Sequence, residues 1–225
     1  MSSLQSHPEL DGFDNLLEGN VRPSLRMSED EFVAWCDEDT RAEWVDGEVV
    51  FMAPDSGEHE DLGWWLKTLL RMFVSQRDLG LVRGPNFMIR LSEQRRRRLP
   101  DVLFIARERS HLLRPAHLEG APDLCIEVVS SDSQSRDRRE KYLEYEKAGV
   151  REYWIVDPLS RTLEGYSLQP GSGFQRIIPE EDEPLLSRLL PGFHLRHSWP
   201  FGQTLPNFIS VLREMGVDPD PNRPA

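Results

Sequence analysis

Apolar positions along the chain follow a helical period in some segments and a strand period in others. The longest helical pattern runs from His59 to about Gln76, where apolar side chains recur every three or four residues. This spacing predicts an amphipathic helix. The residues of its apolar stripe are Leu62, Trp65, Leu66, Leu69, Leu70 and Phe73. We interpret Trp64, beside them, as core or dimer packing rather than as a surface for base stacking.

Shorter apolar runs between turn residues predict strands. The run AEWVDGEVVFMA alternates around Asp46-Gly47, a preferred two-residue turn, and predicts a β-hairpin. Before it, Ser28 and Glu31 have the spacing of a capping box and predict the start of a helix. The runs LPDVLFIA, APDLCIEVVS and REYWIVDP predict further strands, and TLEGYSL with GFQRII predicts a hairpin or meander.

Two more helices complete the pattern. One is predicted from Arg136 to Ala148, with Gly149 at the position expected for a C-terminal stop, and the other from about Leu205 to Met215. The order of helix, strands, helix and strands predicts an α/β fold of mixed α+β type, with a central mixed sheet flanked by helices.

The length of 225 residues is enough for one buried core, so we expect a single domain. We place it at residues 27–215, after an acidic N-terminal arm at 1–26 and before a Pro-rich tail at 216–225. No apolar run approaches the ~18 residues of a membrane span, and the first residues lack the pattern of a signal peptide. Cys36 and Cys125 are far apart and read as free thiols, so we expect a cytoplasmic protein without membrane contact.

The net charge of −12 is unevenly distributed. Residues 1–40 hold ten acids and two arginines, and Glu180–Glu183 adds four more acids. The body of the domain is therefore close to neutral, and it carries the basic run Arg95–Arg98. This run is either a solvated loop or a patch that contacts phosphate. Binding to a polyanion should be weak and salt-sensitive unless a divalent metal assists it.

Four acids lie on or beside the predicted strands: Glu43, Asp101, Asp123 and Glu127. Glu127 is embedded among apolar residues, where a carboxylate needs a partner or a metal. If the strands that carry Asp101 and Glu127 are neighbours, their carboxylates converge and suit Mg²⁺ or Mn²⁺. Asp123 lies ~13 Å from Glu127 along an extended strand at ~3.3 Å per residue, so it is the poorer ligand. From the residues alone, a strand-start acid and a salt-bridged buried acid remain alternatives.

A lysine near such acids would complete a site for phosphodiester hydrolysis. Two residues after Glu127 the strand has Val129, so no lysine is available there. The following helix carries Lys141, which could reach back over the end of the strand. A solvent-facing lysine on a charged helix is the alternative.

The succession of these segments resembles the Uma-type family of putative restriction endonucleases, a branch of the PD-(D/E)xK nuclease superfamily. The resemblance covers roughly residues 27–200 and rests on AEWVDGEVV, LPDVLFIA, PDLCIEVVSSDS, RDRREKYLEYEKAGVREYWIVDP and LLPGFHL. It implies a restriction-endonuclease-like core with a Mg²⁺-dependent phosphodiesterase site. The run Arg95–Arg98 and the acidic arm are not part of the family pattern.

The resemblance also implies roles for individual residues. Asp101 and Glu127 would be the metal-binding acids, Glu43 an additional acid, and Lys141 a lysine relocated from the position of Val129. For His59, which opens the long helix, a supporting role in the site and a capping or surface position are both open.

These observations lead to the hypothesis of a Mg²⁺- or Mn²⁺-dependent endonuclease that hydrolyses DNA. A homodimer would suit double-strand cleavage, because two-fold symmetry presents one site to each strand. The alternative is a module of the same fold that binds nucleic acid or protein without catalysis.

Overall fold

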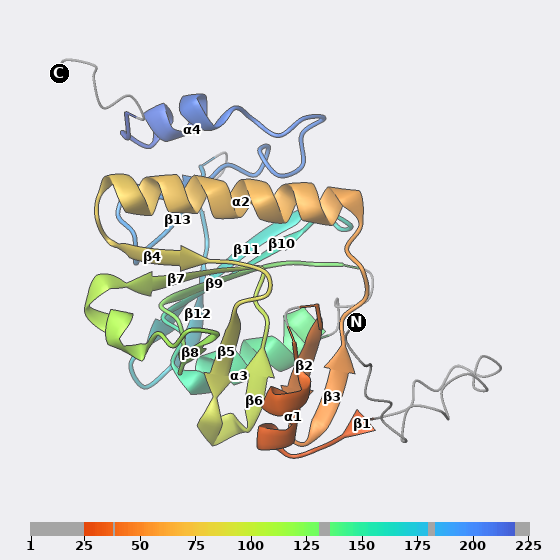
Figure 1. Cartoon of the computed structure of the whole chain (residues 1–225). Helices are drawn as coiled ribbons and strands as arrows, with labels where there is room; N and C mark the ends of the chain where they lie inside the picture. The colour runs from red at the N-terminus through yellow and green to blue at the C-terminus, as the bar shows by residue number, and fades with distance from the viewer. Residues whose placement is uncertain (1–24, 38, 131–135, 180–182, 219–225) are drawn as a thin grey trace.

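The computed structural model describes residues 25–37, 39–130, 136–179 and 183–218, and two six-stranded mixed sheets organise them (Figure 1). The predicted mixed α/β class is confirmed, but the described strands form two six-stranded sheets and a small two-stranded one instead of a single central sheet. Within the described part of the chain, no helix has the length and apolar character needed to cross a membrane.

The larger core surrounds the sheet with strand order β12-β11-β10-β9-β7-β4. Its strands are β4 (Gly80–Arg83), β7 (Val102–Ala106), β9 (Leu124–Val128), β10 (Glu152–Asp157), β11 (Thr162–Gln169) and β12 (Gly173–Ile177). Only β9 and β10 pair in parallel; the other neighbours are antiparallel. The strands that carry the LPDVLFIA and APDLCIEVVS runs, β7 and β9, are neighbours as the sequence predicts, and the short strand between them, β8 (His117–Glu119), belongs to the second sheet.

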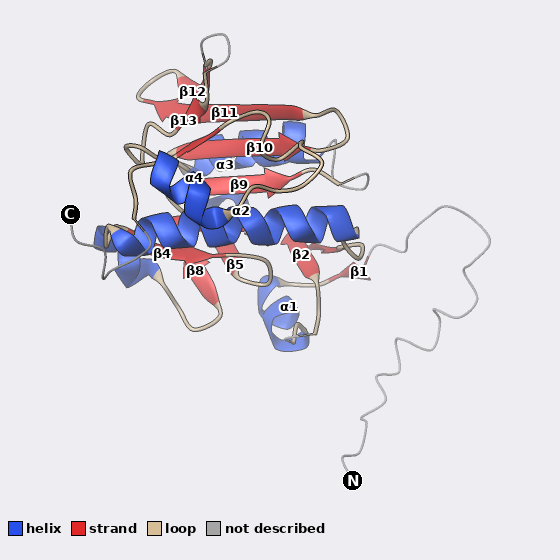
Figure 2. Ribbon diagram, turned by 90° about the horizontal axis from the view of Figure 1, so that it is seen from above, coloured by secondary structure: helices blue, strands red, loops and turns tan. Residues whose placement is uncertain are grey.

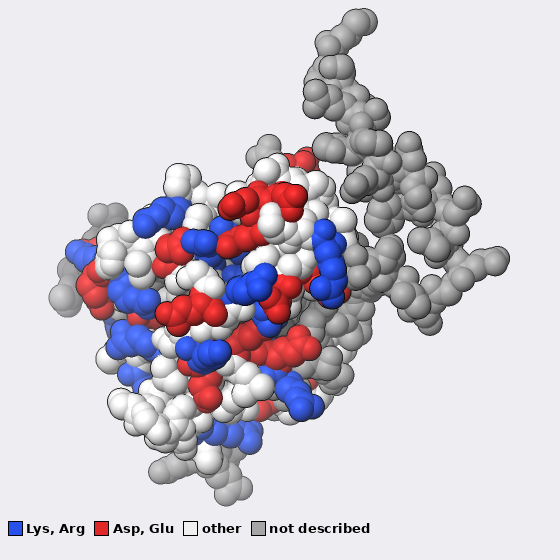
Figure 3. Space-filling view, turned by 90° about the horizontal axis from the view of Figure 1, so that it is seen from below, with Lys and Arg blue, Asp and Glu red and all other residues white. Residues whose placement is uncertain are grey.

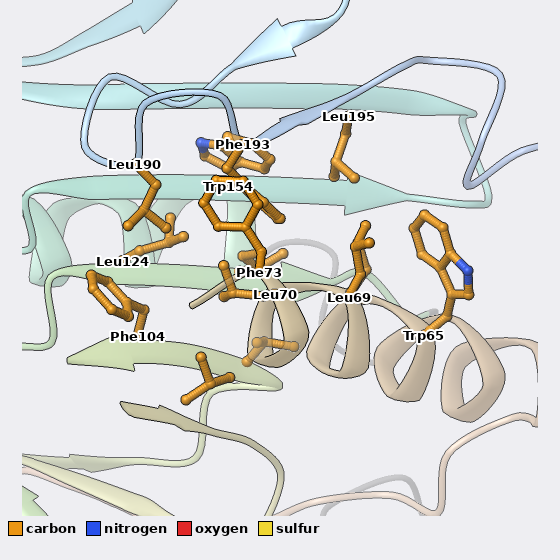
Figure 4. Packing of buried hydrophobic residues seen from close by; sticks show 14 of the residues in the cluster. Trp65, Leu69, Leu70, Phe73, Phe104, Leu124, Trp154, Leu190, Phe193 and Leu195 are labelled. Atoms are coloured by element: carbon orange, nitrogen blue, oxygen red, sulfur yellow. The ribbon is translucent and has the colours of Figure 1, made fainter. Parts of the chain in front are cut away.

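One helix covers each face of this sheet (Figure 2). The long helix α2 (Gly57–Gln76) packs on one face, with its apolar stripe against Phe104, Leu124 and Trp154 (Figure 4). Helix α3 (Tyr142–Ala148) packs on the other face, after a π-helical segment at Arg136–Lys141. Gly149 ends α3 with a positive φ of 85°, as its sequence position predicts.

Residue parity decides which side chain meets which helix, because successive side chains of a strand point to opposite faces. In β9, Leu124 and Ile126 belong to the cluster under α2, whereas Cys125 belongs to the cluster that contains Tyr145 of α3. Glu127 shares the parity of Cys125. Its carboxylate therefore faces α3.

The second sheet has the order β1-β3-β2-β6-β5-β8. Its strands are β1 (Leu25–Arg26), β2 (Ala42–Val45), β3 (Glu48–Phe51), β5 (Met88–Leu91), β6 (Arg96–Arg98) and β8 (His117–Glu119). The turn between β2 and β3 has positive φ at both Asp46 (50°) and Gly47 (90°), as the predicted two-residue hairpin requires.

Helix α1 (Glu29–Trp35) packs on this sheet and begins with the predicted capping box of Ser28 and Glu31. Phe32 of α1 forms a small core with Ala42, Trp44 and Val49.

The C-terminal segment lies over α2. Strands β13 (Leu185–Leu186) and β14 (His194–Leu195) pair, and α4 (Phe208–Glu214) contacts α2. Three details differ from the sequence predictions. Leu25 and Arg26 of the predicted arm form β1, and Val217 of the predicted tail is buried in the core. Trp64 is 61% exposed and packs against the Phe208 ring, so it is not a core residue, while its predicted alternative of dimer packing stays a prediction. The remainder of the predicted arm, residues 1–24, lies outside the described residues.

Candidate active site

Two acids lie opposite each other where β7 begins and its neighbour β9 ends, in the sheet with the order β12-β11-β10-β9-β7-β4. Strands β7 and β9 are in register from Phe104–Leu124 to Val102–Ile126, and the next step of this antiparallel register places Asp101 opposite Glu127. The Asp101 carboxylate accepts a hydrogen bond from the Val128 N–H at 2.7 Å. The register and this bond bring the two predicted metal acids together.

Lys141 reaches Glu127 from the last position of the π-helical segment. Its Nζ lies 3.0 Å from Glu127 Oε2 and 3.9 Å from Glu43 Oε1, and the lysine is only 2% exposed. Lys141 thus places next to Glu127 the positive charge that the apolar Val129, two residues after Glu127, cannot provide. Such a buried cation between two carboxylates is far from the solvent-facing alternative.

Glu43 is completely buried in β2 of the other sheet. Its Oε2 accepts a hydrogen bond from Arg98 Nη1 at 2.6 Å, and its Oε1 accepts one from the Leu99 N–H at 3.0 Å. Burial alone would raise the pKa of Glu43, but the charges of Arg98 and Lys141 outweigh it and lower the pKa. Glu43 is therefore a charged anchor between the two sheets and does not line the cavity described below.

Tyr145 holds the other oxygen of Glu127. Its hydroxyl donates to Glu127 Oε1 at 2.7 Å, one helical turn beyond Lys141. Burial and the nearby charge of Glu127 raise the pKa of Tyr145 well above its ordinary value, so the phenol stays a proton donor. Tyr145 and Lys141 together fix both oxygens of Glu127.

His59 opens α2 on the opposite side of Asp101. Its Nε2 lies 2.8 Å from the Val128 carbonyl and 3.5 Å from Asp101 Oδ2, and its Nδ1 lies 3.3 Å from Asp55 Oδ1. Burial lowers the pKa of His59, but these acceptors outweigh it and raise the pKa to about 9. The structure thus places His59 in the site, in contact with Asp101.

A cavity of about 450 Å³ joins these groups. Asp101, Glu127, Lys141 and His59 all line it. Its lining residues come from the start of α2, the segment just before β7, the end of β9 and the segment 52–56, which follows β3.

The donor set fits a hard divalent cation. Asp101 and Glu127 supply carboxylate oxygens from opposite positions, and the Val128 carbonyl lies beside them. Mg²⁺ binds through one or two carboxylates and keeps waters and phosphate oxygens as its other ligands. In the part of the chain that the structure describes, no group of three or more His, Cys, Asp and Glu is arranged to hold a metal. The fit therefore rests on the two carboxylates, with substrate and water completing the shell.

Three residues of the basic run Arg95–Arg98 differ from both sequence alternatives, a solvated loop and a patch that contacts phosphate. Arg96, Arg97 and Arg98 form strand β6 and are paired inside the protein: Arg97 binds Glu29, and Arg96 and Arg98 bind Glu144. Arg98 has no exposed surface, so a role in contacting DNA is wrong for it, and Arg97 is 7% exposed. Arg95 remains exposed and pairs with Asp46.

On the lower face, the acidic and basic side chains of the described residues interleave and form no single basic patch among themselves (Figure 3).

Asp123 lies at the other end of β9 and has a structural role. It accepts a hydrogen bond from the Ala106 N–H and pairs with Arg109 and Arg151 at 3.0 and 3.2 Å. The fully buried Asp123 therefore braces the sheet and does not line the cavity.

Several residues of the site are absent from the sequence prediction. Tyr145 and Glu144 follow Lys141 at the i+4 and i+3 spacing of one helix face, a signal that could have identified them. Arg98 was predicted only as part of the basic run, and its ion pairs gave no such signal, because its partners Glu43 and Glu144 are 55 and 46 residues away.

Comparison with known proteins agrees with this arrangement. Residues 29–198 match the family model described as "Uma2: Putative restriction endonuclease". A solved structure, a putative nuclease belonging to DUF820 from Anabaena variabilis, is similar with a TM-score of 0.64 and 18% sequence identity. The similarity covers 78% of this chain and 97% of that one and shows a shared fold. A search of curated proteins finds no significant match.

Proposed function

The chain belongs to the Uma2 family of putative restriction endonucleases, and we propose that it is a metal-dependent endonuclease that hydrolyses phosphodiester bonds of DNA. One observation carries the proposal. Asp101 and Glu127 lie opposite each other on neighbouring strands and line one cavity with Lys141, whose Nζ is 3.0 Å from Glu127.

Asp101 and Glu127 would hold Mg²⁺ or Mn²⁺. When bound, such an ion polarises the scissile phosphate and lowers the pKa of a bound water. Each carboxylate is already oriented by the protein: Asp101 by the Val128 N–H, and Glu127 by Tyr145 and Lys141. The ligands therefore need little reorganisation to receive the ion.

Lys141 supplies the positive charge on the substrate side of Glu127. Its ammonium can orient the attacking water and offset the negative charge that develops on the phosphate oxygens. The Glu43 carboxylate restrains the Lys141 ammonium from the protein interior, because Glu43 Oε1 lies 3.9 Å from Lys141 Nζ. His59 holds the Val128 carbonyl and contacts Asp101. In this proposal Glu43, Tyr145 and His59 are positioning residues.

The test is cleavage of supercoiled plasmid DNA in Mg²⁺ or Mn²⁺ by the wild-type protein and by Asp101→Asn and Lys141→Met variants. We expect nicked or linear DNA from the wild type and a loss of at least 100-fold in each variant, the scale of removing one electrostatic group from such a site. Glu93→Gln, which changes an exposed acid outside the cavity, is the matched control and should keep full activity.

Nicking that survives in both site variants would refute the assignment. Calorimetry that measures Mn²⁺ binding distinguishes the proposed nuclease from the alternative, a module of the same fold without catalysis. A wild type that neither cleaves DNA nor binds the ion through Asp101 would be an interaction module on the same fold.

A further inference from the structure

Arg41 is a cation of the candidate active site whose hydrogen-bonding capacity is only partly used. It lies just before β2 and lines the candidate active site across from Asp101 and Glu127. The other two cations of that cavity are engaged: Lys141 contacts two carboxylates, and His59 contacts Asp55, Asp101 and the Val128 carbonyl.

The guanidinium of Arg41 is incompletely satisfied. Its Nη1 donates to Asp55 Oδ2 at 2.8 Å, but its Nε is buried and has no hydrogen-bond partner among the described residues. A buried N–H without an acceptor costs free energy. The present orientation of Arg41 is therefore less favourable than one in which an oxygen acceptor binds the Nε edge.

A second cavity, of about 690 Å³, continues from the first past Arg41. The two share Arg41, Met52, Pro54, Asp55, Pro85 and Asn86. Among the described residues that line the second cavity, Arg41 is the one cation, beside the acids Asp39, Asp55 and Glu60.

Two aromatic side chains form part of the wall of this second cavity. Trp35 and Phe51 meet edge to face at 5.9 Å, and Phe51 is 45% exposed. A cation followed by an exposed aromatic surface matches the two parts of a nucleotide, since phosphate binds the fork of an arginine and a base stacks on an aromatic ring.

We propose that Arg41 binds the phosphate next to the scissile one and that the nucleotide attached to it occupies the Trp35–Phe51 cavity. This subsite rests on the proposed nuclease function, because it places the substrate strand across Asp101 and Glu127. The planar guanidinium can turn its Nε edge to phosphate oxygens while Asp55 restrains its other side. The contact should be sensitive to salt, because each phosphate that a cation neutralises releases counterions from the DNA.

The test is binding of a fluorescein-labelled 20-nucleotide DNA by anisotropy, in single-stranded and duplex form, in Ca²⁺. A gel confirms that the DNA stays intact during the measurement. Affinity is measured for the wild type and for Arg41→Gln over a range of salt concentrations. We expect Arg41→Gln to weaken binding roughly tenfold and to reduce the slope of log K against log salt by about 1, as the loss of one phosphate contact predicts.

Arg196→Gln is the matched control. Arg196 is also partly exposed and paired with an acid, Glu214, but it lies outside both cavities. It should leave the affinity and the slope unchanged. Arg41→Lys keeps the charge and loses the fork, so it should restore the slope but only part of the affinity. Circular dichroism melts confirm that each variant is folded.

The outcomes separate the two proposals. If Arg41→Gln is folded and binds with wild-type affinity and slope, the subsite is wrong, whether or not the wild type cleaves plasmid. If the wild type does not cleave plasmid but its DNA binding depends on Arg41 as described, the nuclease proposal fails, and Arg41 remains a phosphate contact but no longer one next to a scissile phosphate. An equal loss in Arg41→Gln and Arg196→Gln would show only a general charge effect and would also overturn the subsite.

Discussion

Replacing Glu43 by glutamine tests whether its buried charge holds the two sheets and the lysine together. Glutamine has the same shape, and its side-chain oxygen can still accept from the Leu99 N–H at the position of Oε1. It cannot supply the negative charge that faces Arg98 at 2.6 Å and Lys141 at 3.9 Å. The perturbation is therefore mainly electrostatic.

The structure sets the size of the effect. Removing one partner of a buried ion pair costs about 3–5 kcal/mol. Arg98 keeps Glu144, and Lys141 keeps Glu127, so the lower end of that range applies. We expect the free energy of unfolding to fall by about 3 kcal/mol and Tm to fall by about 6–12 °C, at roughly 2–4 °C per kcal/mol for a chain of this size.

The effect should depend on pH in a defined direction. Because the folded pKa of Glu43 is lowered, the stabilisation from its charge is present above its ordinary pKa of 4.5 and is lost as the pH falls through the folded value. The difference in unfolding free energy between wild type and Glu43→Gln should thus be largest near pH 7 and should shrink in acid.

Urea denaturation followed by circular dichroism at several pH values measures this difference. Glu48→Gln is the control, because Glu48 is a neighbouring surface acid in a weak exposed pair with Arg26, and its effect should stay within about 0.5 kcal/mol. A Glu43→Gln variant as stable as the control at pH 7 would contradict the assignment of a charged buried anchor.

Three further predictions concern single side chains. Tyr145→Phe removes the hydroxyl that orients Glu127 and should weaken Mn²⁺ binding in calorimetry roughly tenfold, within the range found for outer-shell partners, while the protein stays folded. Asp123→Asn should lower the unfolding free energy by about 2–4 kcal/mol in urea and leave Mn²⁺ affinity unchanged, because its two arginine partners lie outside the cavity. Arg96→Gln should leave the salt slope of DNA binding unchanged, since its guanidinium pairs with Glu144; a fall of about 1 in the slope would contradict this.

The chain shows which parts of such a site local sequence can reveal. The pairing of β7 with β9 was predictable because sequential strands are often neighbours, and it places Asp101 opposite Glu127. Lys141 was found through the family resemblance together with its place on the following helix. Asp101, Glu127 and Lys141 all lie within a single stretch of about forty residues, so the local order of strands and helix was enough to bring them together.

The burial of the arginines was not predictable in the same way. Four consecutive arginines are typical of an exposed run, yet the structure places Arg98 in the interior. Its counter-charges come from a strand 55 residues earlier and a helix 46 residues later. Only the tertiary fold brings these charges together, so no local pattern distinguishes a buried from an exposed arginine here.

Glu43 does not line the candidate active site, but it contacts the segment between β6 and β7 that joins the two sheets and carries Asp101. Arg98 ends β6 of one sheet, and Asp101 comes three residues later, just before β7 of the other. Glu43 binds the Arg98 side chain and the Leu99 N–H, so it fixes the segment immediately before Pro100, whose ring restricts the backbone further. The position of Asp101 is thus set from both sides, by this segment and by the Val128 N–H. A Glu43 variant that remains folded should therefore weaken metal binding through Asp101, an effect that calorimetry with Mn²⁺ can measure independently of stability.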